Sequence, residues 1–402
     1  MLSVRVPNFF DSEDEPPPPR SAADYDNVVV PLPAPDPERP VLWVSKGGWD
    51  ESGIAQRPWV APGYLMRGAV TVLAGPGSAG KSSIAKAWAM AATFGEDFSR
   101  IRFANPMRVL TYNTEDGLAE EQRRIGAALR QFNRAAAEIP QTFIIAGPQQ
   151  VGTLIERDPM SGYVVNTAAM RQLVAVMTEA QPDIVILDPL VELHNAEEND
   201  NTGLRAVIAE FRTLAQRFNC AILILHHTRK GATVPGDPDS LRGASAIVGA
   251  ARVVMTCVPM SEDEAAKLGI DPKHRRWYFR VDSAKQNYAP IEDAEWFRRT
   301  LYTLDNGEEI VAAEPWAPPS PWDGLSWDVI DQIIDHIRSG PSSGEMYAAA
   351  KQSKARWVGN LVMDLGCRSE AQANSIIRSW IENGLLVQTS YASPARKHGE
   401  TA

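Results

Sequence analysis

Cysteine and long apolar runs are both scarce in this chain of 402 residues. The three cysteines, at positions 220, 257 and 367, lie far apart and show no metal-binding spacing. This usage argues against a disulfide framework and is typical of a reducing compartment. No long uncharged apolar segment suggests a membrane span, and the first residues do not resemble a secretory leader. We therefore expect a cytoplasmic protein with no membrane contact.

A surplus of positive charge is also lacking, because the formal net charge is −10. This balance argues against a protein that coats nucleic acid through bulk charge, although a ring with basic groups on one surface remains compatible with it. Half of the excess lies in residues 1–40, where eight acidic residues face three arginines. The same segment holds ten of the thirty prolines and no sustained period, so we expect a disordered or extended tail.

What is present instead is an alternation of short apolar runs with helical stretches over residues 41–314. Four of the runs are almost continuously apolar, as expected for strands covered on both faces. Helical periods intervene, notably at residues 118–132 and 204–218. This pattern is typical of an α/β fold with a mostly parallel, doubly wound sheet. The expected strands are 69–74, 107–113, 142–146, 183–188, 221–225, 252–258 and 276–281.

A glycine-rich segment follows the first of these strands. It fits the P-loop spacing G-x-x-x-x-G-K-[ST] with Gly75, Pro76, Gly77, Ser78, Ala79, Gly80, Lys81 and Ser82, and Ser83 comes next. The glycines let backbone N–H groups surround a phosphate, Lys81 reaches the β- and γ-phosphates, and the Ser82 hydroxyl binds Mg²⁺. A helix expected over residues 82–93 completes the setting that the motif requires. We therefore expect this segment to bind ATP and Mg²⁺.

Two further acidic positions fit phosphate chemistry. Asp188 ends an apolar strand, as in a Walker B motif, where a carboxylate holds Mg²⁺ together with Ser82. Glu115 follows another strand, and hydrolysis needs a group that orients a water toward the γ-phosphate. Asp116 is its rival for this role, although Asp116 also suits the N-cap of the helix that begins near Leu118.

A histidine pair, His226 and His227, directly follows the expected strand at residues 221–225. Alternation along a strand sends one ring toward the nucleotide and the other toward the sheet. A lone histidine at such a place is more often structural, whereas a polar pair beside a phosphate crevice favours a sensor of the γ-phosphate. We assign the sensor role to His227.

Together these residues resemble the RecA-like ATPases, and within them the hexameric replicative helicases of the plasmid RepA type. The resemblance covers about residues 55–290, and the histidine pair followed by Lys230 and Arg242-Gly243 is its most discriminating part. The segments that carry the resemblance are Arg57–Trp59, the P-loop, Thr114–Asp116, Asp188–Leu190, Glu198–Asp200, His226–Lys230 and Leu241–Ser245.

The resemblance implies a RecA-like P-loop NTPase core that assembles into a homo-oligomeric ring, a hexamer, with ATP between neighbouring subunits. In such a ring Glu115 looks like the catalytic glutamate, His227 like the sensor, and Arg242 like a finger that reaches the next subunit's nucleotide. An arginine finger neutralises charge on the transferring phosphoryl group and is worth about 10³–10⁵ in rate. The tail of residues 1–40 is then a candidate docking segment for a replication partner.

The same resemblance points to a second finger and to DNA contacts. Residues 285–290 are similar to the Lys-x-Arg-x-Gly-Pro hairpin of related helicases, except that Asn287 stands in place of the arginine. Lys285 is then the remaining cationic finger candidate. DNA, expected to be single-stranded, would contact loops that face the centre of the ring. The candidates are the acidic loop 192–202 and the basic loop 229–240.

A small terminal unit, residues 326–402, follows a proline-rich linker at residues 315–325. It shows three helical periods, a capping box at the start of the third, and an expected strand at 385–387. Three helices and a terminal hairpin favour a winged-helix-like domain, although a protein-docking domain fits equally well. The residues expected outward on its recognition helix are Gln372, Asn374 and Arg378.

The preferred functional hypothesis is an ATP-dependent DNA motor, a helicase or translocase that hydrolyses ATP by direct attack of water. The alternative is a DNA-binding adaptor or regulator in which ATP switches assembly without translocation. The acidic balance and the acidic loop favour that alternative slightly. A recombination mediator that forms filaments rather than rings stands between the two.

Overall fold

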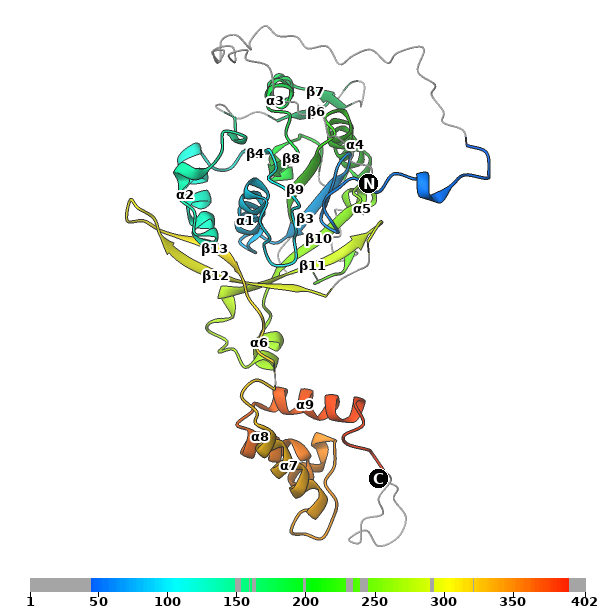
Figure 1. Ribbon diagram of the computed structural model, residues 1–402, viewed down its shortest axis with the longest axis vertical. Helices are drawn as coiled ribbons and strands as arrows, with labels where there is room; N and C mark the ends of the chain where they lie inside the picture. Colours follow the sequence, from blue (N-terminus) through cyan, green and yellow to red (C-terminus); the bar gives the residue numbers. More distant parts are fainter. Residues whose placement is uncertain are drawn as a thin grey trace, which may run out of the picture.

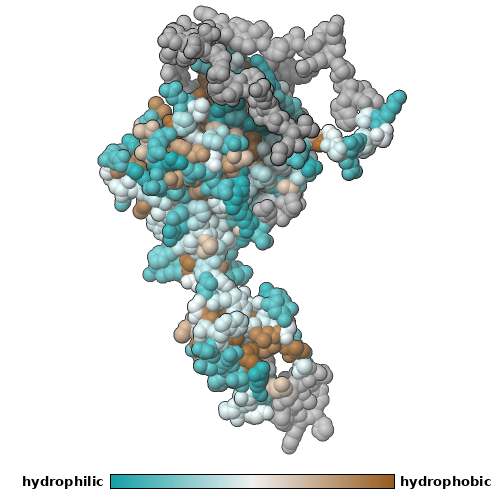
Figure 2. Space-filling view, in the orientation of Figure 1, coloured by the Kyte–Doolittle hydropathy of each residue, from teal (hydrophilic) through white to brown (hydrophobic). Residues whose placement is uncertain are grey.

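The computed structural model describes residues 45–148, 153–158, 160, 164–197, 200–228, 234–238, 245–289, 293–320 and 322–389. They form a larger α/β unit and a smaller helical unit (Figure 1), and a narrow neck joins the two in the space-filling view (Figure 2). Residues 1–40, expected as a tail, lie outside the described residues. None of the described helices is long and apolar enough to cross a bilayer.

A nine-stranded sheet forms the centre of the larger unit. Its strands are β3 Val70–Gly75, β4 Val109–Asn113, β5 Phe143–Ala146, β8 Ile184–Asp188, β9 Ala221–His227, β10 Val253–Pro259, β11 Tyr278–Gln286, β12 Glu295–Thr303 and β13 Glu309–Pro315. Their order across the sheet is β13-β12-β11-β10-β3-β9-β8-β4-β5. The strands from β10 to β5 pair in parallel, whereas β11, β12 and β13 are antiparallel. The expected α/β fold with a mostly parallel sheet is confirmed.

Helices cover both faces of the parallel strands (Figure 1). They are α1 Lys81–Phe94, α2 Leu118–Leu129, α3 Ala168–Ala180, α4 Asn201–Arg217 and α5 Ser245–Ala250. α1 and α2 pack into one apolar cluster, and α3, α4 and α5 pack into another on the opposite face. Successive residues of β9 alternate between them, with Leu223 in the first cluster and Ile224 in the second. This two-sided burial explains why these strands are continuously apolar in the sequence.

The antiparallel hairpin of β12 and β13 is absent from the expectations above. β12 mixes buried residues with exposed and half-buried ones, including two adjacent arginines, so its sequence lacks a long apolar run. Pro315 closes β13, and the linker therefore begins one residue later than expected. Two short antiparallel pairs flank the main sheet, namely β1 Trp59–Ala61 with β2 Leu65–Met66, and β6 Ile155–Arg157 with β7 Val164–Asn166.

The smaller unit has its own apolar core. Its helices are α7 Trp327–Ser339, α8 Val358–Gly366 and α9 Glu370–Glu382, and α9 contacts α6 Glu262–Leu268 of the larger unit. The expected capping box of Ser369 and Gln372 opens α9. The strand expected at residues 385–387 is wrong: that segment is irregular because no described strand lies beside it, and Leu386 packs on the helical core instead. The winged-helix hairpin is therefore not formed within the described residues.

Candidate active site

The parallel register brings the ends of four strands to one edge of the sheet. Gly75 lies opposite His227, and Asn113 lies opposite Asp188. Carboxyl ends of parallel strands are where ligands bind in open α/β sheets. The strand before Glu115 pairs with β8 rather than with the P-loop strand, so Glu115 approaches the site from the side of Asp188.

The P-loop runs from the end of β3 into α1, and two of its glycines are required by neighbouring strands. Gly80 has φ +116°, and an added Cβ would lie 2.9 Å from the Phe279 ring of β11. At Gly75 an added Cβ would lie 2.1 Å from the carbonyl oxygen of Cys257 in β10. Gly77 is different, because no described atom lies within 4 Å of its added Cβ. Close packing of β10 and β11 against the loop therefore explains the first and last glycines of the motif.

Lys81 is almost fully buried at the start of α1, with 3% of its surface exposed. Its ammonium donates hydrogen bonds of 2.9 Å to the carbonyl oxygens of Gly75 and Pro76. Burial lowers the pKa of Lys81, and the nearby carboxylates of Asp188 and Glu115 act in the opposite direction. The lysine therefore brings a poorly solvated positive charge to the loop, where phosphate oxygens would be favourable partners.

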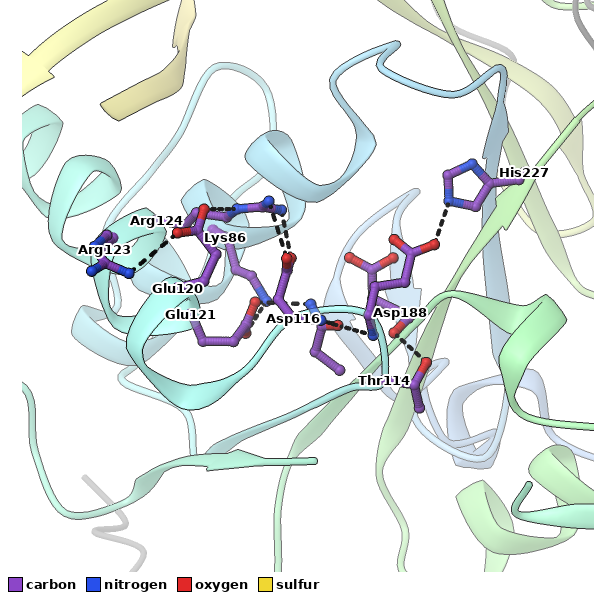
Figure 3. A network of polar contacts seen from close by, with 11 residues as sticks. Lys86, Thr114, Asp116, Glu120, Glu121, Arg123, Arg124, Asp188 and His227 are labelled. Carbon is purple, nitrogen blue, oxygen red and sulfur yellow. Dashed lines mark hydrogen bonds and ion pairs between the residues drawn. The ribbon is translucent and has the colours of Figure 1, made fainter. Parts of the chain in front are cut away.

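Glu115, Asp188 and His227 converge beside the loop, and Figure 3 labels Asp188 and His227. One ligand atom from each lies within 4.8 Å of the others, and His227 Nε2 is 3.8 Å from Glu115 Oε1. Asp188 is 2% exposed, and its buried Oδ1 has no hydrogen-bond partner among the described residues. A buried carboxylate oxygen without a donor is costly unless a cation completes it, so Asp188, with Ser82 on α1, fits a divalent metal.

The two histidines face different surroundings. His227 stands beside Glu115; burial and the charge of Lys81 lower its pKa, while Glu115 and Asp188 raise it in part. His226 is more deeply buried, and burial, reinforced by His227, Lys81 and His194, lowers its pKa to about 4. Both rings are therefore neutral near pH 7, and the ring that the sequence assigns to the nucleotide side is the one beside Glu115.

The structure distinguishes Glu115 from Asp116 as the carboxylate that could act on a water. The Asp116 carboxylate pairs with Arg124 at 2.8 Å, whereas the Glu115 side chain is 48% exposed and its carboxylate lies beside His227. The N-cap of α2 is Gly117, so the N-cap role expected for Asp116 is wrong. Arg124 already neutralises Asp116, and Glu115 is therefore the better placed of the two to act on a water.

A comparison with known families agrees with this geometry. Residues 34–233 match the family model described as an AAA domain, and the match includes the P-loop, Glu115, Asp188 and His227. The matched residues form a P-loop ATPase domain. The match ends just after β9, so the strands that press on Gly75 and Gly80 lie beyond it in the sequence.

Arg299 contacts the P-loop, and sequence reasoning missed it. It reaches from β12 to donate a 2.7 Å hydrogen bond to the carbonyl of Ser78 in the P-loop, and it stacks over Phe279 at 5.1 Å. Burial lowers its pKa, and it makes no ion pair with a carboxylate in the described part of the chain. The signal was the adjacent pair Arg298-Arg299, but strand β12 had to be recognised before one arginine could be directed inward.

The two residues expected to reach the nucleotide of a neighbouring subunit are Lys285 and Arg242, and the structure describes only Lys285. Lys285 donates hydrogen bonds of 2.7 and 2.9 Å to the carbonyls of Val248 and Ala251, so in the single chain it caps the end of α5. Arg242 lies outside the described residues, as do Arg229 and Lys230 of the basic loop.

Of the three α9 residues expected to face outward, Gln372 is partly buried, whereas Asn374 and Arg378 are exposed. Asn374 and Arg378 line a groove that Lys267 of α6 also lines. Gln372 instead uses its side chain to accept a 3.0 Å hydrogen bond from the backbone N–H of Ser369. The surface predicted for recognition therefore faces the ATPase domain in part.

Proposed function

We propose that the chain is an ATP-dependent DNA motor of the replicative-helicase kind, which hydrolyses ATP at the subunit interfaces of a hexameric ring. The observation that carries the proposal is the convergence of Glu115, Asp188 and His227 beside the P-loop. A carboxylate that can act on a water and a neutral histidine at the end of β9, the strand next to the loop, form the arrangement that the RecA-like resemblance implies.

In this function, hydrolysis is a direct attack of water on the γ-phosphorus without a covalent intermediate. Glu115 orients the water and accepts its proton while the bond from the γ-phosphorus to ADP breaks. Lys81 holds the β- and γ-phosphates, and neutral His227 reports the state of the γ-phosphate through a hydrogen bond. Ser82 and Asp188 would hold Mg²⁺, which neutralises charge on the phosphates. Arg242 and Lys285 would act from the neighbouring subunit.

The test is ATP turnover with and without single-stranded DNA, measured together with molar mass in solution. We expect Mg²⁺-dependent turnover that single-stranded DNA stimulates, and a mass of six chains in the presence of nucleotide. Lys81→Ala should lower turnover by at least about 10²-fold, because the charge that stabilises the transition state is removed. Equal turnover in that variant, or no affinity for magnesium nucleotide at millimolar levels, would contradict the proposal.

A second candidate is an adaptor or regulator that binds DNA and uses ATP to switch assembly. The net charge of −10 favours it slightly over a motor, because a motor must hold the nucleic-acid backbone as it moves, and an acidic chain binds that backbone weakly through bulk charge. Strand displacement on a forked duplex separates the two candidates, since an adaptor hydrolyses ATP but does not unwind. Electron microscopy distinguishes a recombination mediator, which forms filaments instead of closed rings.

A further inference from the structure

The P-loop helix carries a buried charge that the ATPase chemistry leaves unused. Lys86 lies on α1 in the middle of an apolar stretch and is 1% exposed. Its ammonium forms an ion pair with Glu121 of α2, which is also 1% exposed. Two charges so far from water are costly to bury, and replacing such a pair with apolar residues is often neutral or stabilising. Stability alone therefore does not explain this pair.

The pair continues into a third buried group. The second carboxylate oxygen of Glu121 accepts a 2.8 Å hydrogen bond from the amide nitrogen of Asn113, which is 2% exposed at the end of β4. The amide oxygen of Asn113 in turn accepts hydrogen bonds from the backbone N–H groups of Glu115 at 2.8 Å and Asp116 at 3.0 Å. Figure 3 labels Lys86 and Glu121, where this chain of contacts begins. From this pair the contacts continue through Asn113 to the turn that carries Glu115.

The chemistry of the chain fixes one orientation of Asn113. A carboxylate only accepts and a backbone N–H only donates, so the Asn113 nitrogen must face Glu121 and its oxygen must face the turn. Turning the amide over would lose all three hydrogen bonds in a buried place, where unpaired groups are expensive. The ion pair with Lys86 holds the Glu121 carboxylate in position. The P-loop helix thereby selects the Asn113 conformation that shapes the turn.

We propose that Asn113, anchored by the buried pair of Lys86 and Glu121, is a positioning residue that sets the place of Glu115 relative to the P-loop helix. This inference rests on the proposed function, in which Glu115 orients the attacking water. Errors of about 1 Å in such a group cost up to about 10²-fold in rate. Asn113 hydrogen-bonds to the turn and to Glu121, and its loss should therefore lower kcat and leave nucleotide affinity unchanged.

The first test compares Asn113→Ala with Asn113→Ser. Alanine removes both hydrogen-bonding ends, and we expect kcat to fall by about 10- to 100-fold with less than about a twofold change in Kd for a fluorescent ATP analogue. Serine keeps one hydroxyl that can accept from the turn, as in Ser/Thr turns, and should recover part of the loss. An Asn113→Ala protein with wild-type kcat would overturn the inference.

The second test removes the anchor without leaving an unpaired charge. In Lys86→Met/Glu121→Leu the ion pair becomes apolar, so the thermal midpoint should fall by no more than the loss of the Asn113 hydrogen bond causes, and the variant should stay folded. We expect kcat to drop by about tenfold while the analogue Kd is unchanged, because the Asn113 amide has lost its fixed partner. A folded double variant with full kcat would show that the pair is structural only, and would refute its anchoring role.

Epistasis separates failure of this inference from failure of the proposed function. If Asn113 acts through Glu115, Asn113→Ala added to Glu115→Gln should lower kcat no further than Glu115→Gln does alone. Multiplied effects in that cycle would refute the positioning role and leave the function standing. If Glu115→Gln itself turns over ATP like the wild type, the catalytic assignment fails, whatever Asn113 does.

Discussion

The two halves of the central sheet contribute different things to one site. The parallel strands β3, β4, β8 and β9 bring Lys81, Glu115, Asp188 and His227 to a common edge. None of these four residues comes from the next parallel strand, β10, or from the antiparallel strands β11 and β12. These strands instead place Cys257, Phe279 and Arg299 against the P-loop. The chemical groups of this site therefore come from the core strands, whereas the shape of its phosphate loop depends on β10, β11 and β12, which lie much later in the sequence.

The supporting contacts show how distant these strands are. Arg299 meets the carbonyl of Ser78 across 221 residues of sequence, and Phe279 fills the space where Gly80 would carry a side chain. The P-loop motif is a local sequence pattern. It predicts a glycine at position 80, but it does not predict that Phe279 is the residue that leaves no room for a side chain there. The variants below test whether these later strands shape the P-loop while the parallel strands supply its chemical groups.

The largest effect is expected at Gly80. In Gly80→Ala the new methyl group meets the Phe279 ring and the residue must keep φ +116°, which costs about 1–3 kcal/mol in backbone strain alone. We expect ATP affinity to fall by about 10²-fold, measured by titration with a fluorescent analogue. Gly77→Ala is the matched control, because no described atom lies within 4 Å of its added Cβ. Equal losses in both variants would show that β11 does not shape the loop.

An acid titration of stability tests the burial of His226, which lies at the end of β9 in the parallel half. The pKa of His226 is about 4 in the folded chain and near 6.5 when exposed, so the unfolded state binds more protons between these values. Stability should therefore fall as the pH is lowered from about 6.5 to 4, by about 3 kcal/mol from this group. Denaturant unfolding at several pH values measures the loss, and His226→Gln should reduce its slope. An unchanged slope would contradict the assignment.

A smaller effect is expected at Arg299. Its charge is partly buried behind the P-loop without a carboxylate partner in the described residues, so Arg299→Ala should weaken ATP binding about 3- to 10-fold. The matched control is the adjacent Arg298→Ala, because Arg298 is exposed and pairs with Glu314 at 2.8 Å. Isothermal titration with a non-hydrolysed ATP analogue provides the comparison. A loss at Arg298 as large as at Arg299 would mean that general charge, and not the loop contact, matters.

Individual residues show which parts of the fold and of the site could be predicted from the sequence. The run before Gly75 and the run before Asp188 are apolar on both faces, so strand, loop and helix followed from composition and spacing. Strand alternation predicted that His226 and His227 face different surroundings, and the sequence favoured His227 for the nucleotide side; only the structure shows that its ring lies beside Glu115. Asn113 and Glu121 gave no signal, since an asparagine at a strand end and a glutamate on a helix are common at surfaces. Lys86 was the visible anomaly, a charge within the apolar part of the P-loop helix.

The sequence by itself determined the P-loop, the polar strand ends and the mostly parallel α/β core, because these depend on residue type and spacing over short distances. Only the tertiary structure decided that Asp116 pairs with Arg124 and leaves Glu115 to the site, that Phe279 and Arg299 support the loop, and that Asn113 is held by a buried ion pair. The physical reason is the range of the contacts. Partners brought together by sheet order and helix packing leave no periodic or spaced pattern in the chain.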